Sequence, residues 1–233
     1  MNFETMLEMF YRQLNLNGAE VVDIGAHSGR HAVPLSNLIG MDGICYAFEP
    51  IPSIRKTLCE NLSLNGLNNT VVYPFALSSS TKRANFNFIP NLPEESGLQK
   101  RHIYNAVPEG IQEIPVKVTT LDDILISREK ISFIKIDVEG GELDVLRGAK
   151  RLMLKSRPIV AFECGAASFL GYHKTPDEIF QIFDSMGFKI YSITGDYIPN
   201  VESFARATTS QNYWDYIALP SVDERLLKCL GSN

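Results

Sequence analysis

The 233-residue chain has few cysteines and no long basic run. Its four cysteines are widely spaced and form no C-x-x-C pair, which argues against a disulfide framework or a zinc site and favours a reducing compartment. The net charge of −5, without clustered Lys and Arg, argues against a protein that grips a nucleic-acid backbone. We therefore expect no nucleic-acid partner.

Long apolar segments are missing as well. No apolar run approaches the roughly 20 residues that span a bilayer, and residues 1–5 lack the basic and apolar regions of a secretory signal. We expect no membrane span and a cytoplasmic location. The remaining composition, 45% hydrophobic and 21% charged, is that of an ordinary globular protein, and the length suits one α/β domain.

Apolar runs alternate with helical patterns along most of the chain. The predicted strands cover residues 21–24, 44–48, 70–75, 131–136, 158–162, 188–193 and 213–219. The predicted helices cover residues 3–14, 30–38, 52–64, a short segment capped by Thr120, 142–154, a segment capped by Thr175, and 223–230. This alternation predicts a mostly parallel sheet with helices on both faces. We find no helical pattern between the last two strands, so they should pair antiparallel at or near one edge.

The chain divides into three parts and one insertion. They are an N-terminal helix at 1–19, an α/β domain at 20–220 with an insertion at about 79–113, and a C-terminal tail at 221–233. The insertion holds no clear helix, but 85–89 and 116–118 alternate like the strands of a hairpin. A loop of this length is often functional. We expect the first helix to pack at the domain edge rather than to cover a site.

The most informative motif lies at residues 21–29, where an apolar run ends in Asp23 and a glycine-rich turn follows. Gly25 and Gly29 carry no Cβ, so the backbone can turn tightly and approach a ligand. Glu49 ends the next apolar run, 20 positions after Gly29, which is about the offset at which a strand-end carboxylate meets ribose hydroxyls. These features predict a site for a nucleoside-bearing cofactor.

The turn differs from the dinucleotide fingerprint G-x-G-x-x-G, because it reads D-x-G-x-x-x-G. An acid two residues before the first glycine repels a pyrophosphate but attracts an ammonium group. S-adenosylmethionine carries an ammonium, a ribose and no phosphate, so we favour it as the cofactor. A nicotinamide-dependent oxidoreductase on a similar sheet and a non-catalytic cofactor-binding module are the alternatives. A plainer interpretation is a tight turn in which Asp23 caps local amides.

Four predicted strands end in acids: Asp23, Glu49, Asp137 and Glu163. In parallel sheets, ligands bind beyond the carboxyl ends of the strands, which lie at one edge. Four separate segments therefore bring carboxylates to the same edge of the predicted sheet. This arrangement predicts a ligand that carries a positive charge.

Five motifs follow one another along the chain. They are Asp-Ile-Gly-Ala at 23–26, Ala-Phe-Glu-Pro at 47–50, Thr-Leu-Asp-Asp at 120–123, Ile-Lys-Ile-Asp-Val-Glu-Gly at 134–140 and Glu-Leu-Asp-Val-Leu-Arg-Gly-Ala at 142–149. In this order they resemble the FkbM-type class I S-adenosylmethionine-dependent methyltransferases, over roughly 20–165 and more loosely to 219. The resemblance implies a Rossmann-like α/β fold with a seven-stranded, mostly parallel sheet and an antiparallel last strand. It also implies O-methylation of a hydroxyl on a sugar, glycan or secondary metabolite.

The resemblance implies roles for individual residues. The glycine turn and Asp23 would hold the methionyl part of the cofactor, Glu49 the ribose, and 76–78 would lie near the adenine. His27 stands where the family usually has Asn, and histidine is tolerated at positive φ. The expected cofactor-binding residues are Asp23, Gly25, Ala26, His27, Gly29, Glu49, Pro50, Ala76, Leu77, Ser78 and Asp137.

Methyl transfer from a sulfonium needs orientation and, for an alcohol acceptor, a base. Asp137 is the first candidate, followed by Glu163 and His173, although Asp137 could instead only orient the methionyl amine or cap the next helix. Asp137 and Glu163 could also hold Mg²⁺, but nothing in the spacing requires a metal, so we expect none. Further base candidates are Glu139, His27 and His31. The sequence specifies neither the acceptor nor the oligomeric state.

Overall fold

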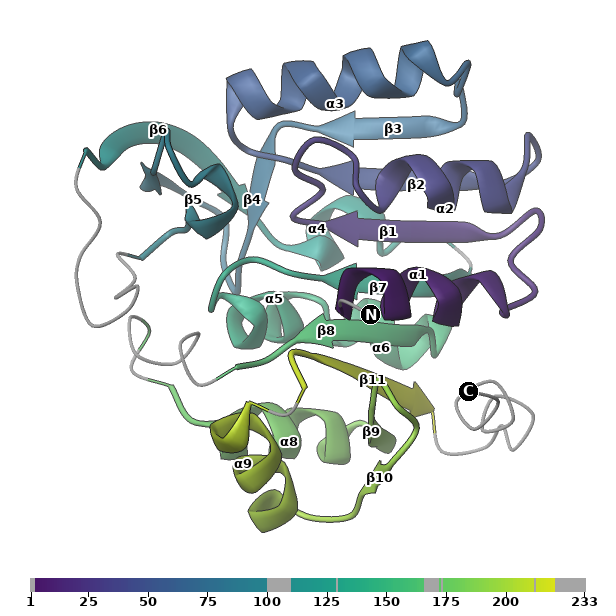
Figure 1. The fold of residues 1–233 in the computed structure, drawn as a ribbon, viewed down its shortest axis with the longest axis vertical. Helices are drawn as coiled ribbons and strands as arrows, with labels where there is room; N and C mark the ends of the chain where they lie inside the picture. Colours follow the sequence, from purple (N-terminus) through teal and green to yellow (C-terminus); the bar gives the residue numbers. More distant parts are fainter. Residues whose placement is uncertain are drawn as a thin grey trace.

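The computed structural model describes residues 3–99, 110–128, 130–165, 172, 174–211 and 213–220. A central sheet dominates the described part of the chain (Figure 1). Its strands are β1 (Glu20–Ile24), β2 (Ile44–Phe48), β3 (Thr70–Tyr73), β7 (Ile131–Ile136), β8 (Ile159–Glu163), β9 (Phe188–Ser192), β10 (Tyr197–Ile198) and β11 (Asp215–Pro220).

The strand order of the sheet is β10-β9-β11-β8-β7-β1-β2-β3. Strands β3, β2, β1, β7 and β8 run parallel, whereas β11 pairs antiparallel with both β8 and β9. The predicted Rossmann-like α/β fold with an antiparallel last strand is therefore confirmed. The described sheet has one strand more than the predicted seven, because the two-residue β10 pairs with β9 at the edge.

A helix that the sequence pattern did not reveal lies between the last two predicted strands. Helix α9 (Val201–Ser210) follows Asn200, whose side-chain oxygen accepts a hydrogen bond from the Ser203 amide. Its apolar positions are few, and its Ser and Thr residues are weak helix formers, so a helical period is hard to read. The expectation of a helix-free connection is wrong, although the antiparallel pairing that we inferred from it is present.

The predicted third strand, 70–75, is broken at Pro74, which has no amide hydrogen for the ladder. The chain leaves the central sheet there, and β4 (Phe75–Leu77) pairs with β6 (Gln112–Thr119) in a second sheet. Strand β5 (Lys82–Phe88) pairs antiparallel with β6, so the predicted hairpin is present with longer strands. Figure 1 shows this second sheet beyond the arrowheads of β1, β2 and β3, which is where ligands bind in parallel sheets.

Helices cover both faces of the central sheet. They are α1 (Phe3–Arg12), α2 (Ala32–Ile39) and α3 (Pro52–Leu64), and on the opposite face α4 (Leu121–Leu125), α5 (Glu142–Gly148), α6 (Lys150–Ser156), α8 (Pro176–Ser185) and α9. The predicted helix over 142–154 is two helices that meet at Ala149. Gly148 directly precedes this break. The position needs glycine because a Cβ there would come within 2.1 Å of the Ser78 carbonyl oxygen.

Helix starts follow local side-chain rules. The Thr120 hydroxyl accepts from the Asp123 amide at 2.9 Å, and Thr175 forms a capping box with Glu178. The predicted helix at 223–230 lies outside the described residues. None of the helices in the described part of the chain has the length and apolar character of a membrane span.

Candidate functional site

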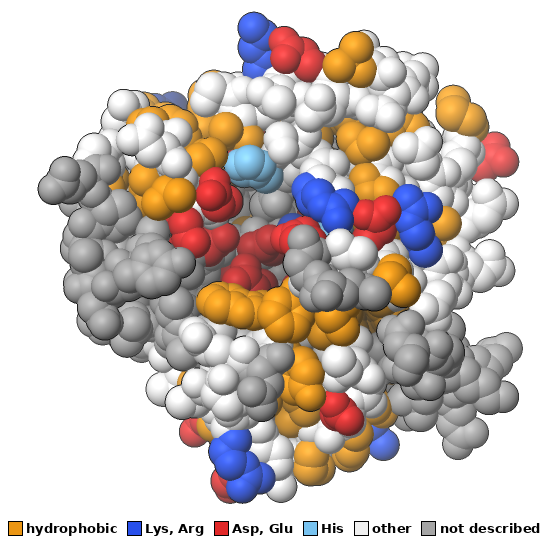
Figure 2. Space-filling model, in the orientation of Figure 1, with side chains coloured by type: hydrophobic (Ala, Val, Ile, Leu, Met, Phe, Trp, Pro, Cys, Tyr) orange, Lys and Arg blue, Asp and Glu red, His pale blue; other side chains and the backbone are white. Residues whose placement is uncertain are grey.

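A cavity of about 270 Å³ opens at the carboxyl ends of β1, β2 and β7. Figure 2 shows the hollow with acidic side chains gathered inside it and apolar side chains along one edge. The predicted cofactor residues that line the cavity are Gly25, Ala26, His27, Glu49, Pro50, Ala76, Leu77 and Asp137. Asp23, Gly29 and Ser78 were expected in this set but are not in the lining, and His173 lies outside the described residues.

The glycine turn is shaped by the strand beside it. Gly25 has φ 79°, and a Cβ on it would come within 1.7 Å of the Asp137 carbonyl oxygen. Gly29 has φ 99° and packs against Leu58. His27 adopts φ 47°, the positive value that we considered tolerable for histidine. Gly25 is therefore required by the close approach of the chain that follows β7, whatever ligand binds.

Glu49 fastens the turn to the end of β2. Its two carboxylate oxygens accept from the His27 amide at 3.0 Å and the Ile51 amide at 2.7 Å. Burial raises the pKa of Glu49 to about 7, against the opposing effect of these two amides. Each oxygen retains a lone pair for a further donor. The side chain lines the cavity, so a ligand hydroxyl could supply that donor.

Asp23 is fully buried, and no group among the described residues donates a hydrogen bond to either of its oxygens. The Lys135 ammonium lies 3.8 Å from one of them, on the residue of β7 that is in register with Asp23. Burial raises the pKa of Asp23, and Lys135 opposes that shift. We expected a ligand ammonium at Asp23, but the ammonium nearest to it in the structure belongs to the protein.

Lys135 is a site residue that the sequence analysis missed, because it sits in a strongly apolar strand. One signal was available, since Lys135 and Asp137 are two positions apart and must share a face of β7. Lys135 lines the cavity and donates to an Asp137 oxygen at 3.0 Å. Burial alone would lower the pKa of Lys135, but Asp137 and Asp23 raise it well above its ordinary value.

Asp137 and Glu163 end adjacent strands and hydrogen-bond each other. Burial favours the neutral form of Asp137, but Lys135 and Glu163 outweigh it and hold the pKa of Asp137 below its ordinary value. Burial and the Asp137 charge raise the pKa of Glu163 well above its usual range. Within this pair, Asp137 therefore loses its proton more readily, and Glu163 keeps its proton more readily.

A third carboxylate joins this pair. Oxygens of Asp137, Glu139 and Glu163 lie within 4.8 Å of one another, and Glu139 has the positive φ of 57°. Oxygen ligands suit Mg²⁺. However, the Lys135 ammonium and the proton on Glu163 already offset much of the negative charge, so this set is less favourable for a cation than three free carboxylates.

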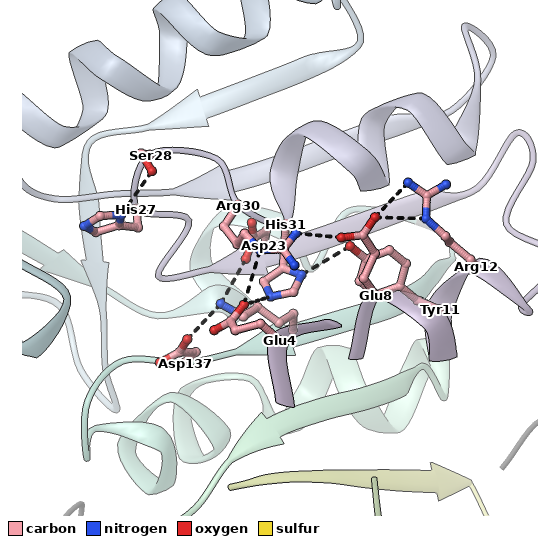
Figure 3. A network of polar contacts seen from close by, with 11 residues as sticks. Glu4, Glu8, Tyr11, Arg12, Asp23, His27, Ser28, Arg30, His31 and Asp137 are labelled. Atoms are coloured by element: carbon pink, nitrogen blue, oxygen red, sulfur yellow. Dashed lines mark hydrogen bonds and ion pairs between the residues drawn. The ribbon is translucent and has the colours of Figure 1, made fainter. Parts of the chain in front are cut away.

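The first helix also reaches the cavity, which the sequence analysis did not foresee. Glu4 of α1 lines it together with Arg30 and His31, from the segment before α2. Figure 3 shows Glu4 and His31 pointing toward one another, and their Oε2 and Nε2 atoms are 2.6 Å apart. The helix does not pack at the domain edge as predicted. Its Leu7 and Tyr11 pack on one face of the central sheet, in a core cluster with Phe133 of β7, and its Glu4 reaches the cavity.

The insertion and strand β4 before it supply the apolar wall of the cavity. Phe75, Phe86 and Leu98 line it, alongside Phe48 from β2. The Tyr172 hydroxyl, from the segment after β8, accepts from the Gln99 amide at 3.3 Å. Two segments far apart in the sequence thus meet over the cavity. No short motif marks these residues, so only their placement in the fold identifies them.

Known proteins resemble the chain in sequence and fold. The model of the methyltransferase FkbM domain matches residues 23–190. Methyltransferase sdnD of Sordaria araneosa is 30% identical over 154 residues, which cover 55% of this chain and 59% of that protein. The hexuronic acid methyltransferase AglP of Haloferax volcanii is 30% identical over 128 residues, which cover 54% of this chain and 48% of that protein.

One solved structure adds to the comparison of folds. The methyltransferase FkbM from Methylobacillus flagellatus KT superposes with a TM-score of 0.55 at 17% identity, covering 89% of this chain and 45% of that one. This likeness shows the fold. The chain spans about half the length of the curated relatives it matches. The predicted family, the FkbM-type S-adenosylmethionine-dependent methyltransferases, is confirmed by the domain match.

Proposed function

The chain belongs to the FkbM methyltransferase family, and from that premise we propose that it transfers a methyl group from S-adenosylmethionine to a hydroxyl of a small-molecule or glycan acceptor. One observation carries the proposal most directly. Asp137, the candidate base, lines the same cavity as the glycine turn and Glu49. The candidate base, the carboxylate that we assign to the ribose and the glycine turn thus line one space.

The residues of the cavity fit the parts of this cofactor. Glu49 can accept hydrogen bonds from ribose hydroxyls, and the apolar wall at Phe48, Phe75 and Leu77 suits an adenine ring. When bound, S-adenosylmethionine supplies a methyl group already activated by its positive sulfur. The protein then needs to orient the acceptor oxygen in line with the carbon–sulfur bond.

Asp137 is the residue that we assign to the acceptor proton. It is ionised at neutral pH, because Lys135 stabilises its charge. As the new oxygen–carbon bond forms and the carbon–sulfur bond breaks, the hydroxyl proton passes to Asp137 and then to solvent. A positioned base of this kind typically contributes about 10²–10⁴-fold. The pKa of Glu163 is raised by burial and by the Asp137 charge, so Glu163 is the less readily ionised of the two and the weaker candidate for this role.

Methylation of a sugar hydroxyl is the finer part of the proposal. AglP, which matches about half of this chain, is named as a hexuronic acid methyltransferase. That name supports a carbohydrate acceptor. A secondary metabolite is the other acceptor class that the resemblance to the family implies. A panel of matched sugar glycosides and aromatic or polyketide alcohols separates the two.

The deciding experiment measures cofactor binding and turnover on the same purified protein. Calorimetry should show saturable binding of S-adenosylmethionine and S-adenosylhomocysteine, and a coupled assay should detect S-adenosylhomocysteine when a suitable acceptor is present. Binding without turnover across the whole panel would favour a non-catalytic cofactor module. Absence of cofactor binding to folded protein, or saturable binding of a nicotinamide dinucleotide instead, would overturn the proposal.

A chelator separates the metal-dependent variant of this reaction from the one proposed. We expect turnover to be unchanged in excess EDTA, because Lys135 and the shared proton already balance the acidic cluster. Loss of turnover that added Mg²⁺ restores would instead show that Asp137, Glu139 and Glu163 hold a metal.

A further inference from the structure

The buried position of Asp23 raises a question about the proposed cofactor. S-adenosylmethionine ends in an amino acid group, with an ammonium and a carboxylate. Asp23 is fully buried beside Lys135 and does not line the cavity, so it is poorly placed to receive that ammonium. The amino acid group therefore needs other partners of both signs among the residues that line the cavity.

Glu4 and Arg30 supply opposite charges at the cavity wall. Both line it, and their side chains are 48% and 45% exposed. The Arg30 Nε atom lies 3.9 Å from a Glu4 oxygen, a loose contact that leaves both groups able to bind a ligand. The hydrogen bond from His31 lowers the pKa of Glu4 and outweighs its partial burial, so the carboxylate is ionised at neutral pH.

The rest of the network holds these two side chains in place. His31 is buried, with its Nε2 atom on Glu4 and its Nδ1 atom 3.2 Å from the Tyr11 hydroxyl. If Tyr11 donates to Nδ1, the Nε2 hydrogen is directed at Glu4. Arg30 is anchored by Glu8 at 2.6 Å. Figure 3 shows this set between α1 and the segment before α2.

We propose that Glu4 and Arg30 bind the amino acid group of S-adenosylmethionine. Glu4 binds the ammonium of that group, and Arg30 binds its carboxylate. This inference rests on the proposed function, because it assigns residues to that cofactor. It makes α1 a part of the cofactor site. The glycine turn and Asp137 line the same cavity as Glu4 and Arg30.

Two ligands test the assignment. S-adenosylhomocysteine carries the amino acid group, whereas 5′-methylthioadenosine has the same nucleoside and sulfur without it. Calorimetry on the wild-type chain should show tighter binding of S-adenosylhomocysteine. Glu4→Gln and Arg30→Gln should each weaken S-adenosylhomocysteine roughly tenfold, and should change 5′-methylthioadenosine less than about twofold. Arg30→Lys, which keeps the charge, should recover part of the loss.

Arg12→Gln is the matched control. Arg12 shares the partner Glu8 with Arg30 and lies on α1, but it does not line the cavity. It should leave both affinities unchanged. Equal losses for both ligands in Glu4→Gln and Arg30→Gln, or no loss for either, would overturn the assignment even though the cofactor binds. If the wild-type chain binds neither ligand, the proposed function itself fails and this inference fails with it.

Discussion

Two acids on either side of β1 face the same cavity, and the structure shifts their pKa values in opposite directions. Glu49, at the end of β2, accepts only from backbone amides, and burial raises its pKa to about 7. Asp137, at the end of β7, lies 3.0 Å from the Lys135 ammonium, and its pKa is below the ordinary value. Glu49 and Asp137 are both carboxylic acids, and each directly follows a strand. A nearby cation decides which acid keeps its charge.

We expect the largest effect from removal of the Asp137 charge, which tests whether the ionised acid acts as the base. If Asp137 accepts the proton of the acceptor, Asp137→Asn should lower kcat by about 10²–10⁴-fold and should weaken cofactor binding only modestly. Steady-state kinetics and calorimetry measure the two effects separately. Wild-type turnover in this variant would eliminate Asp137 as the base.

Glu163→Gln provides the comparison for that variant. Burial and the Asp137 charge favour the neutral form of Glu163, and glutamine is a neutral side chain of similar shape that keeps a hydrogen-bond donor. We expect a loss in kcat of less than about tenfold, far below the effect of a lost base. A loss as large as that of Asp137→Asn would move the proton-accepting role to Glu163.

Removal of the cation should affect stability. Lys135→Met leaves Asp23 and Asp137 without their ammonium, and breaking a buried ion pair costs about 3–5 kcal/mol of unfolding free energy. The double variant Lys135→Met/Asp23→Asn removes the fully buried anion as well and should recover a large part of that loss. Urea denaturation measures both. Equal stability of the single and double variants would mean that Lys135 does not support Asp23.

At the other acid, the expected loss is in cofactor affinity. Glu49→Gln keeps the shape but replaces one acceptor oxygen by an amide, so it should weaken S-adenosylhomocysteine by roughly tenfold, the size of one hydrogen bond to a charged group. Because Glu49 does not touch the acceptor in our proposal, kcat at saturating cofactor should change little. A pure kcat effect would contradict the assignment of Glu49 to the ribose.

The same acid should also make the stability of the fold depend on pH. The pKa of Glu49 rises from 4.5 to about 7 on folding, so between these values the folded chain binds more protons at Glu49 than the unfolded chain. This contribution to the unfolding free energy is complete below pH 4.5 and is lost as the pH rises to about 7. Glu49→Gln should reduce the fall in stability between pH 5 and pH 8 by about 2–3 kcal/mol, measured by urea denaturation. Asp137 titrates at lower pH, so its opposite contribution lies outside this range.

Much of the fold was predictable because its signals are local. The alternation of apolar runs and helices predicted the parallel strands, and Thr120 and Thr175 predicted helix starts that the structure contains. The break at Pro74 was visible in the sequence, but its consequence was not. Pairing of β4 with β6 depends on contacts between segments about 40 residues apart, which no local pattern encodes.

The candidate site was predictable only in part, for the same reason. The glycine turn, Glu49 and Asp137 follow from motifs, and all reach the cavity. Glu4 also reaches the cavity but follows from no motif, because its role depends on the packing of α1 beside His31, 27 positions away in the chain. The metal alternative also depended on distances that only folding supplies.

The sequence by itself determined where strands end, where the backbone must turn, and which family the chain belongs to, since these depend on neighbouring residues and their order. Only the tertiary structure decided the partner of each acid. Asp23 meets Lys135, Glu49 meets backbone amides, and Glu163 shares its proton with Asp137. The physical reason is that burial makes ionisation depend on groups a few ångströms away, which come from distant parts of the chain.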